Sequence, residues 1–182
     1  MAPPRFLTVL APALSAVAVS AVAACGTPVD APQTRPETAP GPVTPAAPVL
    51  PPEPATDGPC PYLAESVVED VNGQLVAAVR ISLDQPYPAC FFERGDGNEQ
   101  LRTWIVEGSP DAAVAVVDAA APVATSDPAE LPGGWSGGSE PTGSGAVYAV
   151  AKEGTAVVVT TNQAQTINAR RIAEQVIANL GL

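Results

Sequence analysis

The chain of 182 residues contains no histidine, and its only lysine is Lys152. Without histidine, Ser-His-Asp catalysis, Cys-His catalysis and histidine-based metal sites are all excluded. A Walker-type phosphate loop is excluded as well, because it needs a lysine followed by serine or threonine. Only 8 basic residues stand against 19 acidic ones, which leaves no electrostatic surface for nucleic acid. We therefore expect no nucleic-acid partner, no metal and no organic cofactor.

Residues 1–24 have the parts of a secretory signal, with Arg5 as the single positive charge before an apolar run. The closing run Val22-Ala23-Ala24-Cys25 resembles the lipobox of bacterial lipoprotein signal peptides. That resemblance implies a protein held on the extracytoplasmic side of a cell membrane by acyl chains on Cys25, where two chains give stable anchoring. The alternatives are an ordinary cleaved signal or an uncleaved anchor, since about 20 apolar residues can span a bilayer. Pro12 argues against the anchor.

Residues 25–59 start at the lipidation site and continue as a segment rich in proline, alanine and threonine. Each proline removes a backbone donor and fixes φ, so no periodic apolar face survives. We expect an extended, disordered tether that reaches up to about 3.1 Å per residue. A proline-motif ligand for a recognition domain is the alternative.

Cys60 and Cys90 remain as an even pair once Cys25 is acylated. In an oxidising compartment such a pair predicts a structural disulfide. A redox role would need CxxC spacing or an activating cation, and a cysteine-only zinc site would lack two of its ligands.

Residues 60–182 are long enough for one domain with its own core. The helices are expected at residues 63–71, 110–121 and 163–180. Asn72-Gly73 ends the first of them, although the same pair could instead turn a hairpin. The strands are expected at residues 75–83, 89–92, 101–107, 145–152 and 155–162. We predict an α+β fold, an antiparallel sheet of about five strands with the helices packed on one face.

Residues 122–144 are expected to be irregular, and they carry Trp135 among glycines. A segment of more than about 12–15 residues without secondary structure is commonly functional or disordered. The Trp135 ring either docks on the domain or contacts a lipid, glycan or protein partner. Trp135 is therefore our candidate partner or ligand contact.

Three segments look like those of an uncharacterised family of actinobacterial, mycobacterial-type cell-envelope lipoproteins. They are Cys60-Pro61-Tyr62-Leu63, residues 86–92 and residues 157–163. The resemblance implies a compartment and a domain of unknown function, with no catalytic residue to carry over. Our main hypothesis is a non-enzymatic, membrane-anchored envelope lipoprotein with a binding or interaction domain. The alternatives are a carrier of lipid or another apolar ligand, and a hydrolase of envelope polymers that uses carboxylate pairs such as Glu69-Asp70.

Overall fold

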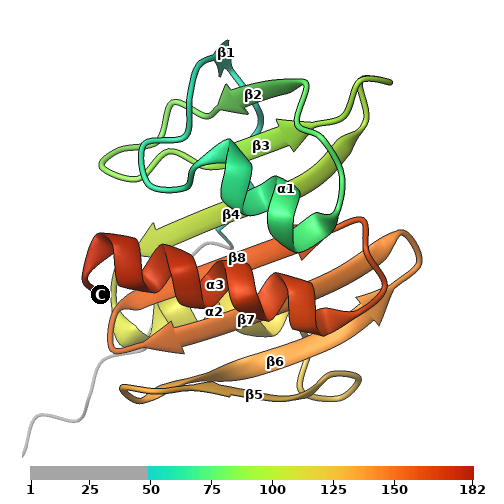
Figure 1. The fold of residues 1–182 in the computed structure, drawn as a ribbon. Coiled ribbons are helices and arrows are strands. Elements are labelled where there is room, and N and C mark those ends of the chain that lie inside the picture. Colours follow the sequence, from blue (N-terminus) through green and yellow to red (C-terminus); the bar gives the residue numbers. More distant parts are fainter. Residues whose placement is uncertain (1–48) are drawn as a thin grey trace, which may run out of the picture. The chain divides into compact units, whose positions relative to one another are not determined.

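The computed structural model describes residues 49–182, so the expected signal peptide, Cys25 and most of the expected tether lie outside the described residues. Eight antiparallel strands form one sheet in the order β1-β2-β3-β4-β8-β7-β6-β5 (Figure 1). The strands are β1 (Thr56–Asp57), β2 (Ala78–Ile81), β3 (Cys90–Glu93), β4 (Glu99–Glu107), β5 (Asp127–Leu131), β6 (Trp135–Thr142), β7 (Gly145–Lys152) and β8 (Thr155–Thr161). The helices are α1 (Glu65–Asn72), α2 (Pro110–Ala120) and α3 (Thr166–Leu180).

The three helices lie where their sequence signals predicted. α1 ends at Gly73, which has a left-handed φ of 68° and whose N–H donates to the Glu69 carbonyl, so the hairpin alternative is wrong. At the start of α2, the Ser109 hydroxyl accepts a hydrogen bond from the Ala112 N–H, with Pro110 at the first helical position. None of the helices within residues 49–182 is long and apolar enough to cross a bilayer.

The expected strand count was too low, because residues 122–144 contain β5 and β6 instead of an irregular loop. Gly133 and Gly134 both have a φ of 89° and make the turn between these strands. β6 is built from small residues, with Gly137 and Gly138 in its middle, so it carries no alternating apolar pattern. A strand of that composition has no periodic signal to detect.

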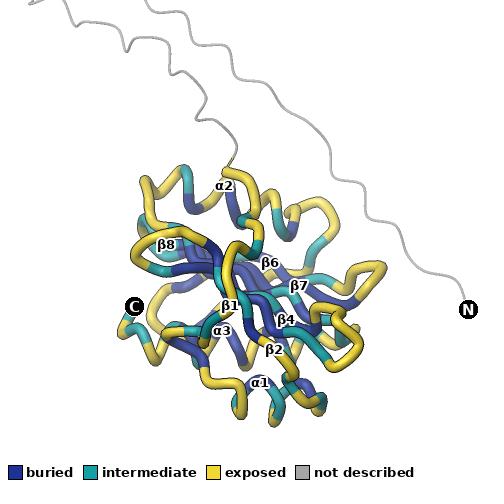
Figure 2. The backbone as a smooth tube through the Cα atoms, turned by 90° about the horizontal axis from the view of Figure 1, so that it is seen from above, coloured by how far each residue is buried: buried dark blue, intermediate teal, exposed yellow. Residues whose placement is uncertain are grey.

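The expectation that the helices cover one face of the sheet was also wrong. α1 and α3 lie on one face and α2 lies on the other (Figure 1). Each face has its own apolar core, one containing Ile172 and Val176 of α3 and the other containing Val116 and Val117 of α2. Buried residues concentrate in the sheet between these layers (Figure 2). β7 and β8 are buried on both faces, which explains their uninterrupted apolar sequences.

The sheet begins inside the segment assigned to the tether. β1 pairs with β2, and just before it the Ala55 N–H donates to the Ile81 carbonyl at 2.9 Å. The preceding residues lie on the α2 face, where Pro51 shares a cavity with Trp104 of β4 and Ala120 of α2. We call residues 49–55 the strap.

Candidate functional site

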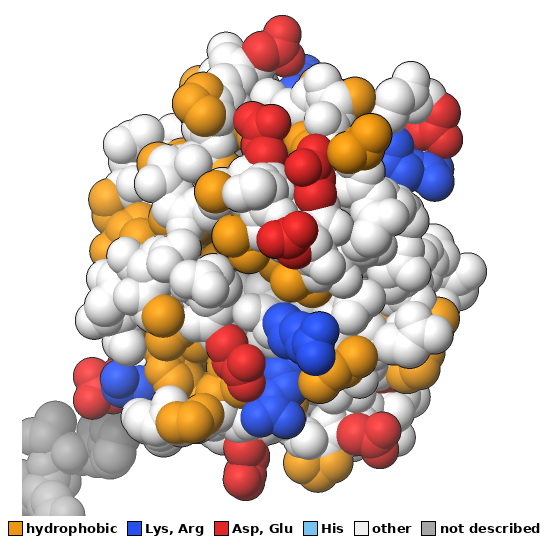
Figure 3. Space-filling model, viewed as in Figure 1, with side chains coloured by type: hydrophobic (Ala, Val, Ile, Leu, Met, Phe, Trp, Pro, Cys, Tyr) orange, Lys and Arg blue, Asp and Glu red, His pale blue; other side chains and the backbone are white. Residues whose placement is uncertain are grey.

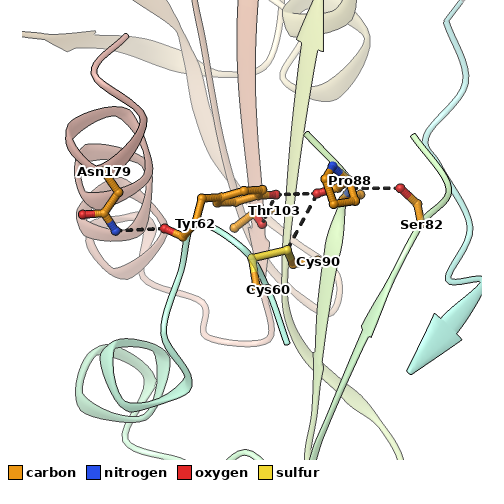
Figure 4. The surroundings of a disulfide bond; sticks show 8 residues. Cys60, Tyr62, Ser82, Pro88, Cys90, Thr103 and Asn179 are labelled. Atoms are coloured by element: carbon orange, nitrogen blue, oxygen red, sulfur yellow. Dashed lines mark hydrogen bonds between the residues drawn. A yellow bond between two sulfur atoms is a disulfide. The ribbon is translucent and has the colours of Figure 1, made fainter. Parts of the chain in front are cut away.

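A disulfide joins Cys60 to Cys90, as the sequence predicted, with a Cα–Cα distance of 5.6 Å (Figure 4). Cys90 is fully buried on β3, and Cys60 lies in the connection between β1 and α1. The disulfide therefore links the segment between β1 and α1 covalently to β3.

Tyr62 lies close to the disulfide and connects the start of β3 with β4 and α3 (Figure 4). Its hydroxyl donates to the Pro88 carbonyl at 2.8 Å and lies 3.0 Å from the Thr103 hydroxyl. Because the single phenol proton goes to Pro88, the Thr103 hydroxyl acts as donor to the Tyr62 oxygen. Asn179 of α3 donates to the Tyr62 carbonyl at 2.9 Å. Burial raises the pKa of Tyr62 well above its ordinary value, against the lowering by Thr103, so the phenol stays neutral.

The turn between β2 and β3 is held by the buried hydroxyl of Ser82. That hydroxyl donates to the Asp84 carboxylate at 2.6 Å and accepts from the Ala89 N–H at 2.9 Å. With the Pro88 carbonyl bonded to Tyr62, hydrogen bonds hold both ends of the turn. These hydrogen bonds hold the backbone of the turn in one conformation.

A cleft of about 390 Å³ opens between this turn, the end of β4 and the strap. It is lined by Val49, Leu50, Pro52, Asp84, Gln85, Pro86, Tyr87, Trp104, Ile105, Val106 and Glu107. A second hollow of about 190 Å³ lies beside it, with Pro51, Arg102 and Trp104 among its lining residues. Trp104 borders both, and we call the two hollows together the Trp104 groove.

Arg102 lines the smaller hollow and interacts with an aromatic ring and a carboxylate. The Arg102 guanidinium lies 5.8 Å from the centroid of the Phe91 ring, and its Nε is 3.7 Å from the Glu99 carboxylate. Burial raises the pKa of Glu99, Arg102 opposes that rise, and the negative charges of Glu93 and Glu53 add to it. The region near Glu99 is therefore rich in negative charge, and Glu53 of the strap contributes to it.

Trp135, our candidate partner contact, lies on β6 and is only 2% exposed. Its ring belongs to the core beneath α3, together with Leu131 and Tyr148. Of the two alternatives for this ring, the structure agrees with docking. The idea that an irregular loop presents it to a partner was wrong, because the segment is a strand and the ring is covered.

A cluster of amide and hydroxyl side chains, which sequence reasoning missed, joins the end of α1 to β4 and β8. The Asn72 amide donates to the Gln100 carbonyl at 3.1 Å and accepts from the Thr161 hydroxyl at 2.8 Å. Gln100 in turn donates to the Leu75 carbonyl at 2.9 Å. These buried groups satisfy one another, so the cluster holds three elements together. Its partners are far apart in sequence, and no local pattern indicates it.

The carboxylates form no metal centre in the part of the chain that the structure describes. Glu69, named above as part of an acidic pair, accepts a hydrogen bond from the Val76 N–H at 2.9 Å. Within residues 49–182, no group of three or more Asp, Glu, Cys or His side chains could hold a metal ion. On the face of α1 and α3, acidic side chains gather over α1 and basic ones over α3 (Figure 3).

A family model described as a domain of unknown function, DUF2020, matches residues 42–182. The match covers most of the chain, so the chain belongs to this family. It begins before the strap, which is therefore inside the family's own range. No curated protein matches the chain.

Proposed function

We propose that this member of the DUF2020 family is a cell-envelope lipoprotein, anchored by acyl chains on Cys25, with a non-catalytic binding domain. The lipobox-like run that ends at Cys25 supports the anchor. The buried disulfide supports an oxidising compartment, because such bonds persist outside the cytosol.

The Trp104 groove is the observation that carries the binding function. It is concave, its walls include the aromatic residues Trp104 and Tyr87, and Asp84 and Glu107 supply polar groups. Ligand sites generally combine an apolar concave surface with a few polar groups that orient the ligand. The disulfide, Tyr62 and Ser82 hold one wall of the groove in place before any ligand arrives, which favours binding.

The anchor is tested by changing Cys25 to serine in the full chain. Only a thiol accepts the diacylglyceryl group, so Cys25→Ser should lose all label from a fatty-acid probe and move to the aqueous phase in detergent partition. Cys60→Ser is the matched control, because it also removes one thiol but should keep the label. Equal labelling of the wild-type chain and Cys25→Ser would overturn the lipoprotein proposal.

A carrier of an apolar ligand is the second candidate. An open hollow of about 620 Å³ between the end of α3 and the β5–β6 turn favours it, with Leu131, Pro132, Ile177 and Leu182 among its lining residues. Native mass spectrometry of the chain purified from membranes distinguishes the two candidates. A carrier retains a lipid-sized added mass beyond the acyl chains, and Ile177→Asp should remove that mass.

A further inference from the structure

We propose that the Trp104 groove recognises an extended, proline-rich segment of a partner protein, and that the strap occupies the groove as a ligand from the same chain. This inference rests on the proposed binding function and names the partner class of that site. The partner segment carries a basic residue at the position that Glu53 holds in the strap.

The chemistry of the observed occupant is the first argument. The strap contains Pro51, Pro52 and Pro54, and residues 49–55 have no regular secondary structure. Pro51 lines the smaller hollow and Pro52 lines the cleft, and Trp104 borders both. Prolines set against an aromatic side chain are the usual way in which proteins bind extended proline-rich peptides, which lose little entropy on binding.

The strap fills the groove incompletely. Hollows of about 390 and 190 Å³ remain beside it. Leu50 is 76% exposed and Val49 is 44% exposed, so neither aliphatic side chain is well packed. The backbone hydrogen bonds of this segment to the sheet begin only at Ala55. Residues 49–54 are thus held mainly by side-chain contacts, and a better-fitting segment can replace them.

The floor under the strap belongs to the core on the α2 face of the sheet. With the strap in place, Trp104 is 8% exposed and Phe91 is 2% exposed. The cleft wall at Pro86 and Tyr87 is fixed by the Ser82 and Tyr62 hydrogen bonds described above. A partner therefore meets a shaped surface and does not have to order it.

Charge is the reason why we expect the groove to prefer a basic partner segment. Burial is the main cause that raises the pKa of Glu99, Arg102 opposes the rise, and the negative charge of the exposed Glu53 in the strap adds to it. Glu93 acts on Glu99 in the same direction. A segment with lysine or arginine in place of Glu53 would exchange this repulsion for attraction. We therefore expect a basic, proline-rich segment to compete with the strap for the groove.

The test measures peptide binding to the purified full chain in detergent. The probes are two fluorescein-labelled peptides, one with residues 45–55 and one with the same residues carrying Glu53→Lys. The receptors are the wild-type chain and a strap variant, Pro51→Ser with Pro52→Ser. Because a tethered ligand competes at an effective concentration near the millimolar range, the strap variant should bind the lysine peptide about tenfold more tightly than the wild type. The lysine peptide should also bind more tightly than the unmodified one, with an advantage that shrinks in high salt.

Two further changes locate the site in the strap-variant background. Val106→Asp removes an aliphatic side chain from the wall of the cleft and should weaken binding of the unmodified peptide below detection, whereas Val114→Asp, at a half-exposed position of α2, should leave it intact. If Val106→Asp lowers the melting temperature too far, Gln85→Arg serves instead. Gln85 is exposed at the rim of the cleft, and its replacement should repel the lysine peptide without touching a core.

Three results would overturn the proposal. The first is equal or undetectable peptide binding by the wild-type chain and the strap variant. The second is a preference of the groove for a fluorescent fatty acid, blocked by Val106→Asp, which would make it an apolar-ligand site. The third is a strap variant that binds no peptide because it forms dimers through the groove. Each of these leaves the fatty-acid labelling of Cys25 unaffected, so failure here and failure of the anchor are distinguishable.

Discussion

The ammonium group of Lys152 lies 5.5 Å from the centroid of the Trp135 ring. Ser136 of β6 pairs with Ala151 of β7. Trp135 and Lys152 are the next residues on these neighbouring strands, so they lie opposite each other at the strand ends. The only lysine of the chain thus covers a ring that is otherwise enclosed by the core beneath α3. Trp135 is a core residue, and we therefore expect its replacement to lower the stability of the domain.

Trp135→Ala should lower the free energy of unfolding by about 3–5 kcal/mol, because it removes a fully buried aromatic side chain. Urea unfolding of the full chain measures this loss. Lys152→Met, which keeps the length of the side chain and removes the cation, should cost only about 0.5–1 kcal/mol. In a Trp104→Phe background, the emission of Trp135 should be blue-shifted and protected from quenchers. Red-shifted emission that is readily quenched would contradict the buried position.

Replacing both Cys60 and Cys90 by alanine should destabilise the domain by about 2–5 kcal/mol, because the bond restricts the unfolded chain. The measurement compares urea midpoints of the wild type, the double variant and the reduced wild type. Thiol titration of the denatured, unreduced Cys25→Ser chain should detect no free thiol. Two free thiols per chain would show that the bridge does not form in the purified protein.

Gly137 lies where β6 closely approaches both β7 and α2. A Cβ atom at this position would collide with the Ala149 carbonyl oxygen and would lie 2.9 Å from Cγ1 of Val117. We expect Gly137→Ala to cost about 1–3 kcal/mol through overpacking. Gly143→Ala is the matched control, because a Cβ there meets nothing within 4 Å, and it should stay within about 0.5 kcal/mol of the wild type. Equal melting temperatures for the two variants would contradict the packing described for α2.

Glu99 should make stability depend on pH. Burial raises its pKa in the folded state above the ordinary 4.5, so its contribution to stability is complete below that pH and is lost as the pH rises through the folded-state pKa. Replacing it with neutral glutamine should therefore stabilise the protein more at pH 7 than at pH 4. Urea midpoints at the two pH values test this, with Glu107→Gln at an exposed position as the control. A gain that is larger at pH 4 would mean that attraction by Arg102 outweighs burial.

Several elements could be predicted because their signals are local. Ser109-Pro110 marks the start of α2, and Gly73 and Gly181 mark the ends of α1 and α3. Helix caps satisfy backbone groups only a few residues away, so the identity of those residues is sufficient. The Cys60–Cys90 disulfide could be predicted without structural information, since only one pairing remains when Cys25 is set aside.

The hairpin of β5 and β6 could not be predicted in the same way. Gly137 has low strand propensity, and it belongs to β6 because β7 and α2 leave no space there for a larger side chain. The α2 face was likewise missed, although the unbroken apolar sequence of β7 and β8 is typical of strands covered on both sides. That pattern was the one available signal for a second helical layer.

The sequence by itself determined the exclusion of histidine chemistry, the disulfide pairing, the helix boundaries and most of the sheet. Only the tertiary structure decided that α2 lies opposite α1 and α3, that Trp135 is enclosed, and that the strap crosses Trp104. The physical reason is the distance in sequence between the residues that interact. Caps, turns and periodicity act between residues a few positions apart, whereas Pro51 and Trp104 are far apart in the sequence and meet beside Ala120 on the face of the sheet that α2 covers.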